Sequence, residues 1–107
     1  MDLNLNQNIL LKNKIMNDQE IIKKATKALK ELNLFSNNYN RIQVLKVIND
    51  ELIELDPELK DKYSVMFSYK LPDGRGAHTS VEVDRKTDKL LYIITRSNIY
   101  EIPEELK

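Results

Sequence analysis

The sequence predicts a single α+β domain, in which two N-terminal helices pack on one face of a three- to four-stranded antiparallel sheet. Two patterns carry this prediction. Apolar residues recur at helical spacing as far as Leu55, and from Tyr63 onward they alternate with polar residues, as in half-buried strands. Helices that precede a run of strands are typical of an α+β layout. A length of 107 residues fits one domain, which we place at residues 17–107.

The first helix is predicted over residues 18–33. Asn17, followed three residues later by Glu20, forms a capping-box pattern, because each side chain can bond a free backbone N–H at a helix start. The apolar residues that follow fall within a stripe of about 120°, with lysines on the opposite side. Asn33 is a suitable stop. Residues 1–16 show no clear helical period, and we expect them to form an N-terminal arm, either a short strand or a loosely ordered segment.

A second helix is expected after the polar, turn-rich run FSNNYN. From Ile42 to Leu55 the apolar residues form a stripe about 180° wide, which suits a helix with two neighbours. This helix should end at Leu55, because Pro57 disfavours the α conformation of Asp56. Asp56 and Pro57 then suit the N-cap and the first residue of a short helical turn.

Three strands and a short fourth strand are expected in the rest of the chain. Val65 and Phe67 share one face of the first strand, and Val81 and Val83 share one face of the second. The opposite, polar face of the second strand is expected to carry the side chains of His78, Ser80, Glu82 and Asp84.

Turn signals separate these strands. The run Pro72-Asp73-Gly74 predicts the first turn. In the second turn Asp88 occupies a position that suits a left-handed residue, so we expect slight strain there. Residues 90–94 are apolar on both faces, as expected of a central or covered strand. A fourth strand is predicted over residues 99–102, before Pro103.

Composition excludes several classes of protein. Lys and Arg number 17, and so do Asp and Glu, so the overall charge indicates neither nucleic acid nor an anionic membrane as a partner. The chain has no cysteine, which excludes a disulfide framework, a zinc ribbon and thiol chemistry. Asp2 and interspersed asparagines do not resemble a signal peptide. We therefore expect a cytoplasmic protein that holds no cofactor and no metal.

Two segments are candidate partner-binding sites. The densest acidic run surrounds Pro57, and an acidic patch can cover a basic surface of a partner, as in inhibitors and immunity proteins. The loop PDGRGAH places two glycines around Arg75, whose guanidinium could meet a carboxylate or phosphate. The candidate partner-binding residues are Glu51, Glu54, Glu58, Asp61, Arg75 and His78.

Neither catalysis nor nucleic-acid binding has strong support. His78 is the chain's one histidine, and a small hydrolase based on it would lack the third, orienting group of a triad. The lysine face of residues 18–33, with Arg75, Arg85 and Lys86, could contact nucleic acid, but the chain has no interleaved aromatic and basic motif. We therefore do not expect an enzyme.

Residues 63–93 resemble the strand–turn–strand of PepSY-like and cystatin-like small domains. In those domains a helix packs on a hairpin that ends in the pattern V-x-V-D-x-x-T-G-K-L/V. Asp88 departs from the pattern, because the family usually has glycine there. The resemblance implies a binding or inhibitory module, and PepSY domains are thought to modulate peptidases. The matching residues are Val81, Val83, Asp84, Thr87, Lys89 and Leu90.

The sequence thus predicts a small non-enzymatic protein-interaction module of the inhibitor, immunity or accessory type. It would bind a protein partner through the acidic run or through the loop at residues 72–78. Nucleic-acid binding through the lysine face is the alternative, and a hydrolase based on His78 is a third. A sheet face left uncovered by helices would suit a homodimer.

Overall fold

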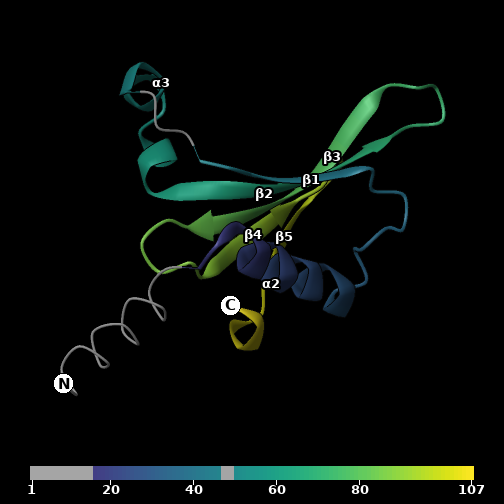
Figure 1. The fold of residues 1–107 in the computed structure, drawn as a ribbon, viewed down its shortest axis with the longest axis horizontal. Coiled ribbons are helices and arrows are strands. Elements are labelled where there is room, and N and C mark those ends of the chain that lie inside the picture. Colours follow the sequence, from purple (N-terminus) through teal and green to yellow (C-terminus); the bar gives the residue numbers. More distant parts are fainter. Residues whose placement is uncertain (1–15, 47–49) are drawn as a thin grey trace.

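The computed structural model describes residues 16–46 and 50–107. Figure 1 shows the arrangement of the elements. In chain order the elements are α2 (Asp18–Glu31), β1 (Arg41–Leu45), α3 (Asp50–Leu55), the 3-10 helix η1 (Pro57–Lys60), β2 (Lys62–Lys70), β3 (Gly76–Asp84), β4 (Leu90–Ile94), β5 (Ile99–Glu101) and the 3-10 helix η2 (Glu104–Leu106). Within the described ranges, no helix is long and apolar enough to cross a membrane.

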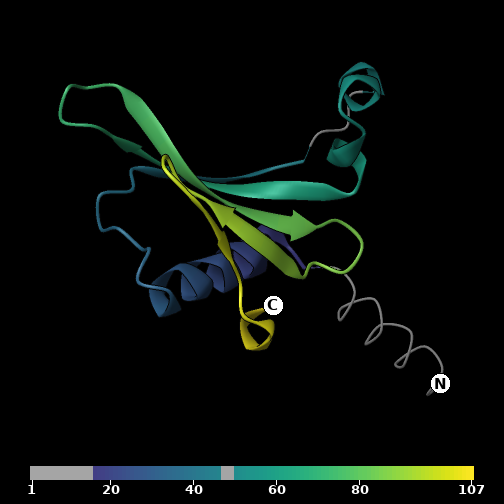
Figure 2. The ribbon, with the colours of Figure 1, turned by 180° about the vertical axis from the view of Figure 1, so that it is seen from behind.

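The sheet is an antiparallel meander. Its five strands lie in the order β1-β2-β3-β4-β5, which is also their order in the chain. Helix α2 lies against one side of the sheet, as the front and back views show together (Figures 1 and 2). The predicted α+β class is confirmed. The element count is corrected, because the sheet has five strands and the described chain has one long helix rather than two.

The predicted second helix over residues 42–55 is wrong in its first part. Residues 41–45 form the edge strand β1, in which Ile42 lies opposite Phe67 and Val44 lies opposite Val65. Only Asp50–Leu55 is helical, and residues 47–49 lie outside the described residues. The physical reason is the alternation of two β-branched residues with polar ones, which favours a strand that covers the end of the core.

Helix α2 begins as predicted, at Asp18. The Asn17 side chain accepts the backbone N–H of Glu20 at 2.8 Å. This bond satisfies one of the free donors at the helix start. The helix ends two residues earlier than expected, at Glu31, and Asn33 adopts the left-handed conformation with φ of 59°. The expected N-terminal arm lies outside the described residues except for Met16, whose N–H donates to Asp88 Oδ2 at 3.0 Å.

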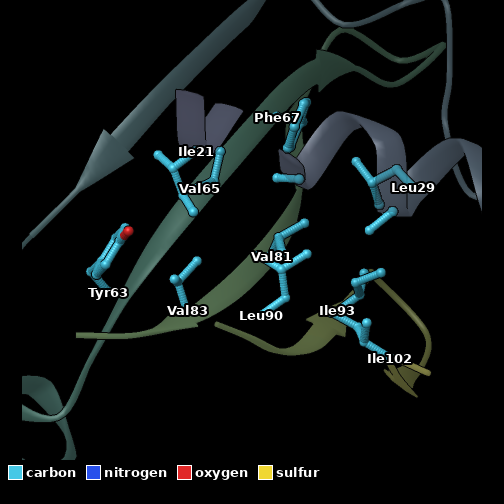
Figure 3. Packing of buried hydrophobic residues seen from close by; sticks show 12 residues of the cluster. Ile21, Leu29, Tyr63, Val65, Phe67, Val81, Val83, Leu90, Ile93 and Ile102 are labelled. Atoms are coloured by element: carbon cyan, nitrogen blue, oxygen red, sulfur yellow. The ribbon is translucent and has the colours of Figure 1, made fainter. Parts of the chain in front are cut away.

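The core lies between α2 and the facing side of the sheet. Figure 3 shows the side chains of the helix packed over those of β2, β3 and β4, with Ile102 closing one end. The predicted inward positions Val65, Phe67, Val81 and Val83 are all fully buried. The complete cluster is Ile21, Ala25, Ala28, Leu29, Tyr63, Val65, Phe67, Val81, Val83, Leu90, Ile93 and Ile102.

We call the other side of the sheet the outer face. The 3-10 helix η1 reaches it at one end, where Glu58 Oε2 lies 3.9 Å from Lys62 Nζ. Residues directly opposite each other in paired strands point to the same side, so the register defines this face. It carries the side chains of Arg41, Gln43, Leu45, Lys62, Ser64, Met66, Ser68, His78, Ser80, Glu82, Tyr92, Ile94, Ile99 and Glu101.

Both predicted turns are present. The Gly74 N–H donates to the Leu71 carbonyl at 2.9 Å, and Gly74 has φ of +87°, so residues 71–75 form a hairpin turn with a left-handed glycine. In the second turn the Asp84 side chain accepts the N–H groups of Lys86 and Thr87, and these bonds lower the pKa of that carboxyl. Asp88 has φ of 58°, which confirms the predicted left-handed residue.

Candidate partner-binding surfaces

The acidic residues lie on a corner that projects beyond the sheet. We call residues 50–61, which comprise α3, η1 and the residues that follow each of them, the acidic protrusion (Figures 1 and 2). Glu51, Glu54, Glu58 and Asp61 are all exposed on it. The structure therefore brings together the four carboxylates that the sequence indicated as a binding patch.

Helix α3 buries none of its residues. Leu55 is 82% exposed and Leu52 is 48% exposed, which is unusual for large apolar side chains in a helix. An isolated six-residue helix is marginal in water, because helix formation needs either length or tertiary packing. The protrusion thus presents two leucines among carboxylates without using them in the core.

The base of the protrusion is held firmly to the sheet. The Asp56 side chain accepts the Glu58 N–H at 3.2 Å and begins η1, as predicted for the Asp-Pro pair. The backbone N–H of Arg85 donates to the Asp61 carbonyl at 2.9 Å, and Arg85 Nη1 donates to the Leu59 carbonyl at 2.9 Å. The second turn of the sheet therefore anchors η1, while α3 extends beyond this anchor.

The loop around Arg75 is a closed hairpin turn. Arg75 Nε lies 2.6 Å from Asp73 Oδ2, and the Arg75 N–H donates to Asp73 Oδ1 at 3.0 Å. The guanidinium charge is therefore partly neutralised within the loop. His78 is exposed on the outer face, opposite Ser68.

The two predicted binding segments do not meet. The acidic protrusion precedes the Lys62 end of β2, and the hairpin turn follows the Lys70 end. Eight residue steps of a strand span about 27 Å. Figures 1 and 2 show the two segments at opposite ends of the sheet. A partner of ordinary size would use one of them as its centre, not both.

A buried polar cluster lies on the outer face, where the sequence predicted only exposed polar residues. Glu82 is 5% exposed and Ser80 is 7% exposed. Ser80 Oγ donates to Glu82 Oε2 at 2.5 Å, and Lys62 Nζ donates to Glu82 Oε1 at 3.1 Å. The same ammonium donates to the Tyr92 hydroxyl at 2.8 Å. The alternation of β3 placed Glu82 on this face, but it gave no sign of the covering neighbours.

The polar groups of this cluster bond to one another. Burial lowers the pKa of Lys62, but the hydrogen bonds to Tyr92 and Glu82 and the charge of Glu82 outweigh burial, so the pKa is raised. Lys62 therefore remains a cation, and both oxygens of the Glu82 carboxylate are occupied. No hydrogen bond joins His78 to Ser80 among the described residues, so the geometry gives Ser80 no basic partner other than a carboxylate held by a cation.

A second buried cluster ties the start of α2 to the turn between β3 and β4. The Tyr63 hydroxyl donates to Asp88 Oδ1 at 2.6 Å, and Lys24 Nζ donates to the Asp88 carbonyl at 2.9 Å. Burial, followed by the hydrogen bond to Asp88, raises the pKa of Tyr63 above its ordinary value. Burial lowers the pKa of Lys24, and the charge of Asp88 partly opposes this. These contacts fix the helix against the turn, and Asp88 is 7% exposed.

The lysine face of α2 borders a shallow hollow of about 800 Å³. Lys23, Lys27 and Lys30 line it together with Glu20 and Glu31, so both signs of charge are present. Such a mixed, exposed face gives no specific indication of a nucleic-acid site.

Comparisons with known proteins identify no relative. No family model, no curated protein and no solved structure matches the chain. The resemblance of residues 63–93 to PepSY-like and cystatin-like domains therefore stays a prediction. Within the described part of the chain, no three His, Asp or Glu side chains are grouped closely enough to hold a metal ion.

Proposed function

We propose that the protein is a non-enzymatic interaction module that binds a basic protein partner through the acidic protrusion. The observation that carries the proposal is the exposure of Leu55 and Leu52 on a helix in which no residue is fully buried. An acidic patch alone is often only a solvated surface. Large apolar side chains within such a patch add the feature that distinguishes binding sites from other surfaces.

The chemistry of the partner follows from the two kinds of side chain. Exposed Glu54 and Glu58 favour lysines or arginines on the partner and increase the rate of encounter at low salt. Leu55 would enter an apolar pocket between these bases, where its burial would supply affinity. The protrusion would thus cover a basic surface, in the manner of an inhibitor or immunity protein.

The experiment compares three forms of the protein as bait in an extract of the organism that encodes it. The forms are the wild type, Glu54→Lys with Glu58→Lys, and Glu104→Lys with Glu105→Lys. Both double variants change the net charge by the same amount, and all four glutamates are exposed. Circular dichroism and thermal unfolding first establish that each form is folded.

We expect one stoichiometric protein to bind the wild type and the control, and to be lost from the variant of the protrusion. Leu55→Ser should weaken the same complex without a change of charge. A partner that binds all three forms equally would exclude the protrusion as the binding site. The absence of any partner would contradict the proposal as a whole.

A further inference from the structure

The outer face has a polar centre that a second protein surface could cover without breaking any hydrogen bond. Both oxygens of Glu82 accept bonds from neighbours on the same face, and Lys62 donates to Glu82 and to Tyr92. Groups that are already paired lose little when water is removed, whereas unpaired polar groups are costly to bury. This centre therefore offers a docking surface little resistance.

Apolar side chains surround this centre. Met66 and Ile94 lie on either side of Ser80 in one row across β2, β3 and β4, and both are half-buried. Ile99 continues the row on β5 and is 69% exposed. On β1 the same row holds Gln43, and the exposed Leu45 lies in the neighbouring row, with Ser64 and Glu82. The apolar strip thus runs from Met66 on β2 to Ile99 on the edge strand β5.

Two exposed charges lie at diagonally opposite corners of this face. Arg41 begins β1 and is aligned with Ser68 and His78, towards the hairpin turn. Glu101 ends β5 and is aligned with Tyr92 and Glu82, towards the opposite end of β3. Among the described residues, neither of the two has an ion-pair partner.

This diagonal arrangement is the one that a twofold interface needs. In an isologous dimer, residue i of one subunit meets residue j of the other, and j meets i. A twofold axis in the plane of the face, perpendicular to the diagonal, brings Arg41 of each copy over Glu101 of its partner. The same axis makes the apolar strips of the two copies cross near Ser80, so Met66 and Ile94 lie at the centre of the interface. A partner with a net charge would not find an excess of the opposite charge on this face, which carries both signs.

We propose that two copies of this chain pack outer face to outer face, with the apolar strips at the centre and two Arg41–Glu101 pairs at the rim. Two packed sheets lie about 10 Å apart, which suits interdigitating side chains of this size. The five strands span only about 20 Å across. The interface is therefore smaller than a standard one, and we expect a reversible dimer at micromolar concentration or above.

Sedimentation velocity over a wide range of protein concentration tests this proposal. The wild type should change from monomer to dimer with increasing concentration. Arg41→Glu alone and Glu101→Arg alone should each raise the dissociation constant about tenfold or more, because each reversal occurs twice in a dimer and creates repulsion. The double variant Arg41→Glu with Glu101→Arg should restore the wild-type dissociation constant. Both positions are exposed, so the substitutions leave the core intact.

A central substitution and a distant control complete the test. Ile94→Lys should abolish the dimer. Glu54→Lys alone should leave the dimer unchanged, because it leaves Glu58, which lies 3.9 Å from Lys62 of the outer face, unaltered. The result is then independent of the proposed function of the protrusion. A wild type that stays monomeric would overturn the proposal. It would also be overturned by a dimer that survives Ile94→Lys, or by a double charge swap without rescue. Loss of a different bound protein upon Ile94→Lys, with a monomeric wild type, would assign the face to that protein instead.

Discussion

Replacing Asp88 by glycine should destabilise the protein, although the backbone at this position suits glycine. Asp88 has φ of 58°. Glycine adopts such a conformation without strain. The carboxylate, however, accepts the Tyr63 hydroxyl at 2.6 Å and the Met16 N–H at 3.0 Å. The substitution therefore removes backbone strain and two hydrogen bonds at the same time. The sum of these effects decides whether the free energy of unfolding rises or falls.

The hydrogen bonds should outweigh the strain. Relief of the left-handed conformation contributes about 1 kcal/mol at most for an aspartate. Tyr63 is 3% exposed. Its hydroxyl would therefore be left buried without an acceptor, at a cost of about 1–3 kcal/mol. The lost bond of Met16 adds about 1 kcal/mol. We expect a net loss of about 1–3 kcal/mol in the free energy of unfolding, or a decrease in Tm of roughly 4–12 °C.

Urea unfolding of four proteins measures this effect: the wild type, Asp88→Gly, Tyr63→Phe and the double variant. When Tyr63→Phe has already removed the hydroxyl, Asp88→Gly should lower the free energy of unfolding by less. The double variant should therefore be more stable than the sum of the two single changes predicts. Asp88→Asn is the control for the Tyr63 bond, because asparagine tolerates the left-handed conformation and its amide oxygen still accepts the hydroxyl, whereas its NH2 group cannot accept the Met16 N–H. An Asp88→Gly protein at least as stable as the wild type would refute the reasoning.

Three further perturbations test other parts of the structure. Gly74 has φ of +87°, whereas Gly76 has no such conformation and open space around it. Gly74→Ala should therefore lower the free energy of unfolding by about 1 kcal/mol, and Gly76→Ala should change it far less. Equal effects in urea unfolding would contradict the assignment of the turn. Lys62→Met leaves the Glu82 carboxylate buried without a cation. It should cost about 1–3 kcal/mol, and the addition of Glu82→Gln should recover part of this loss. Simple additivity of the two changes would exclude coupling. The raised pKa of Tyr63 means that the unfolded chain loses this proton near its ordinary pKa while the folded protein keeps it. Stability measured from about pH 8 to about pH 11 should therefore fall more steeply for the wild type than for Tyr63→Phe.

Local signals in the sequence were sufficient to predict the start of the first helix and the two turns. A capping side chain, a proline in an Asp-Pro pair and a left-handed residue act within a few residues of themselves. Asn17, Asp56 and Asp88 therefore behave as their local sequence predicts. The alternation of β2 and β3 identified the inward residues for the same reason.

The edge strand β1 was not predicted, because the apolar residues of this segment fit both the periodicity of a strand and that of a helix. Ile42 and Val44 lie two apart, as in a strand, yet with the apolar residues that follow they also fit a wide helical stripe. Strand pairing with β2 decided between the two, and pairing is a property of the whole fold. The burial of Glu82 depends in the same way on its neighbour Lys62, which lies 20 positions away in the chain.

Each strand of the sheet pairs with the strand next to it in the chain, which has a consequence for synthesis on the ribosome. The sheet can grow strand by strand as the chain emerges. The core cannot, because Ile21 and Leu29 emerge first, whereas Ile93 and Ile102, which complete the same cluster, emerge much later. Until then the apolar stripe of α2 has only part of its cover, and such exposed surface is where nascent chains aggregate or bind chaperones. The nascent chain is therefore most prone to aggregate between the release of α2 and the release of Ile102 from the ribosome.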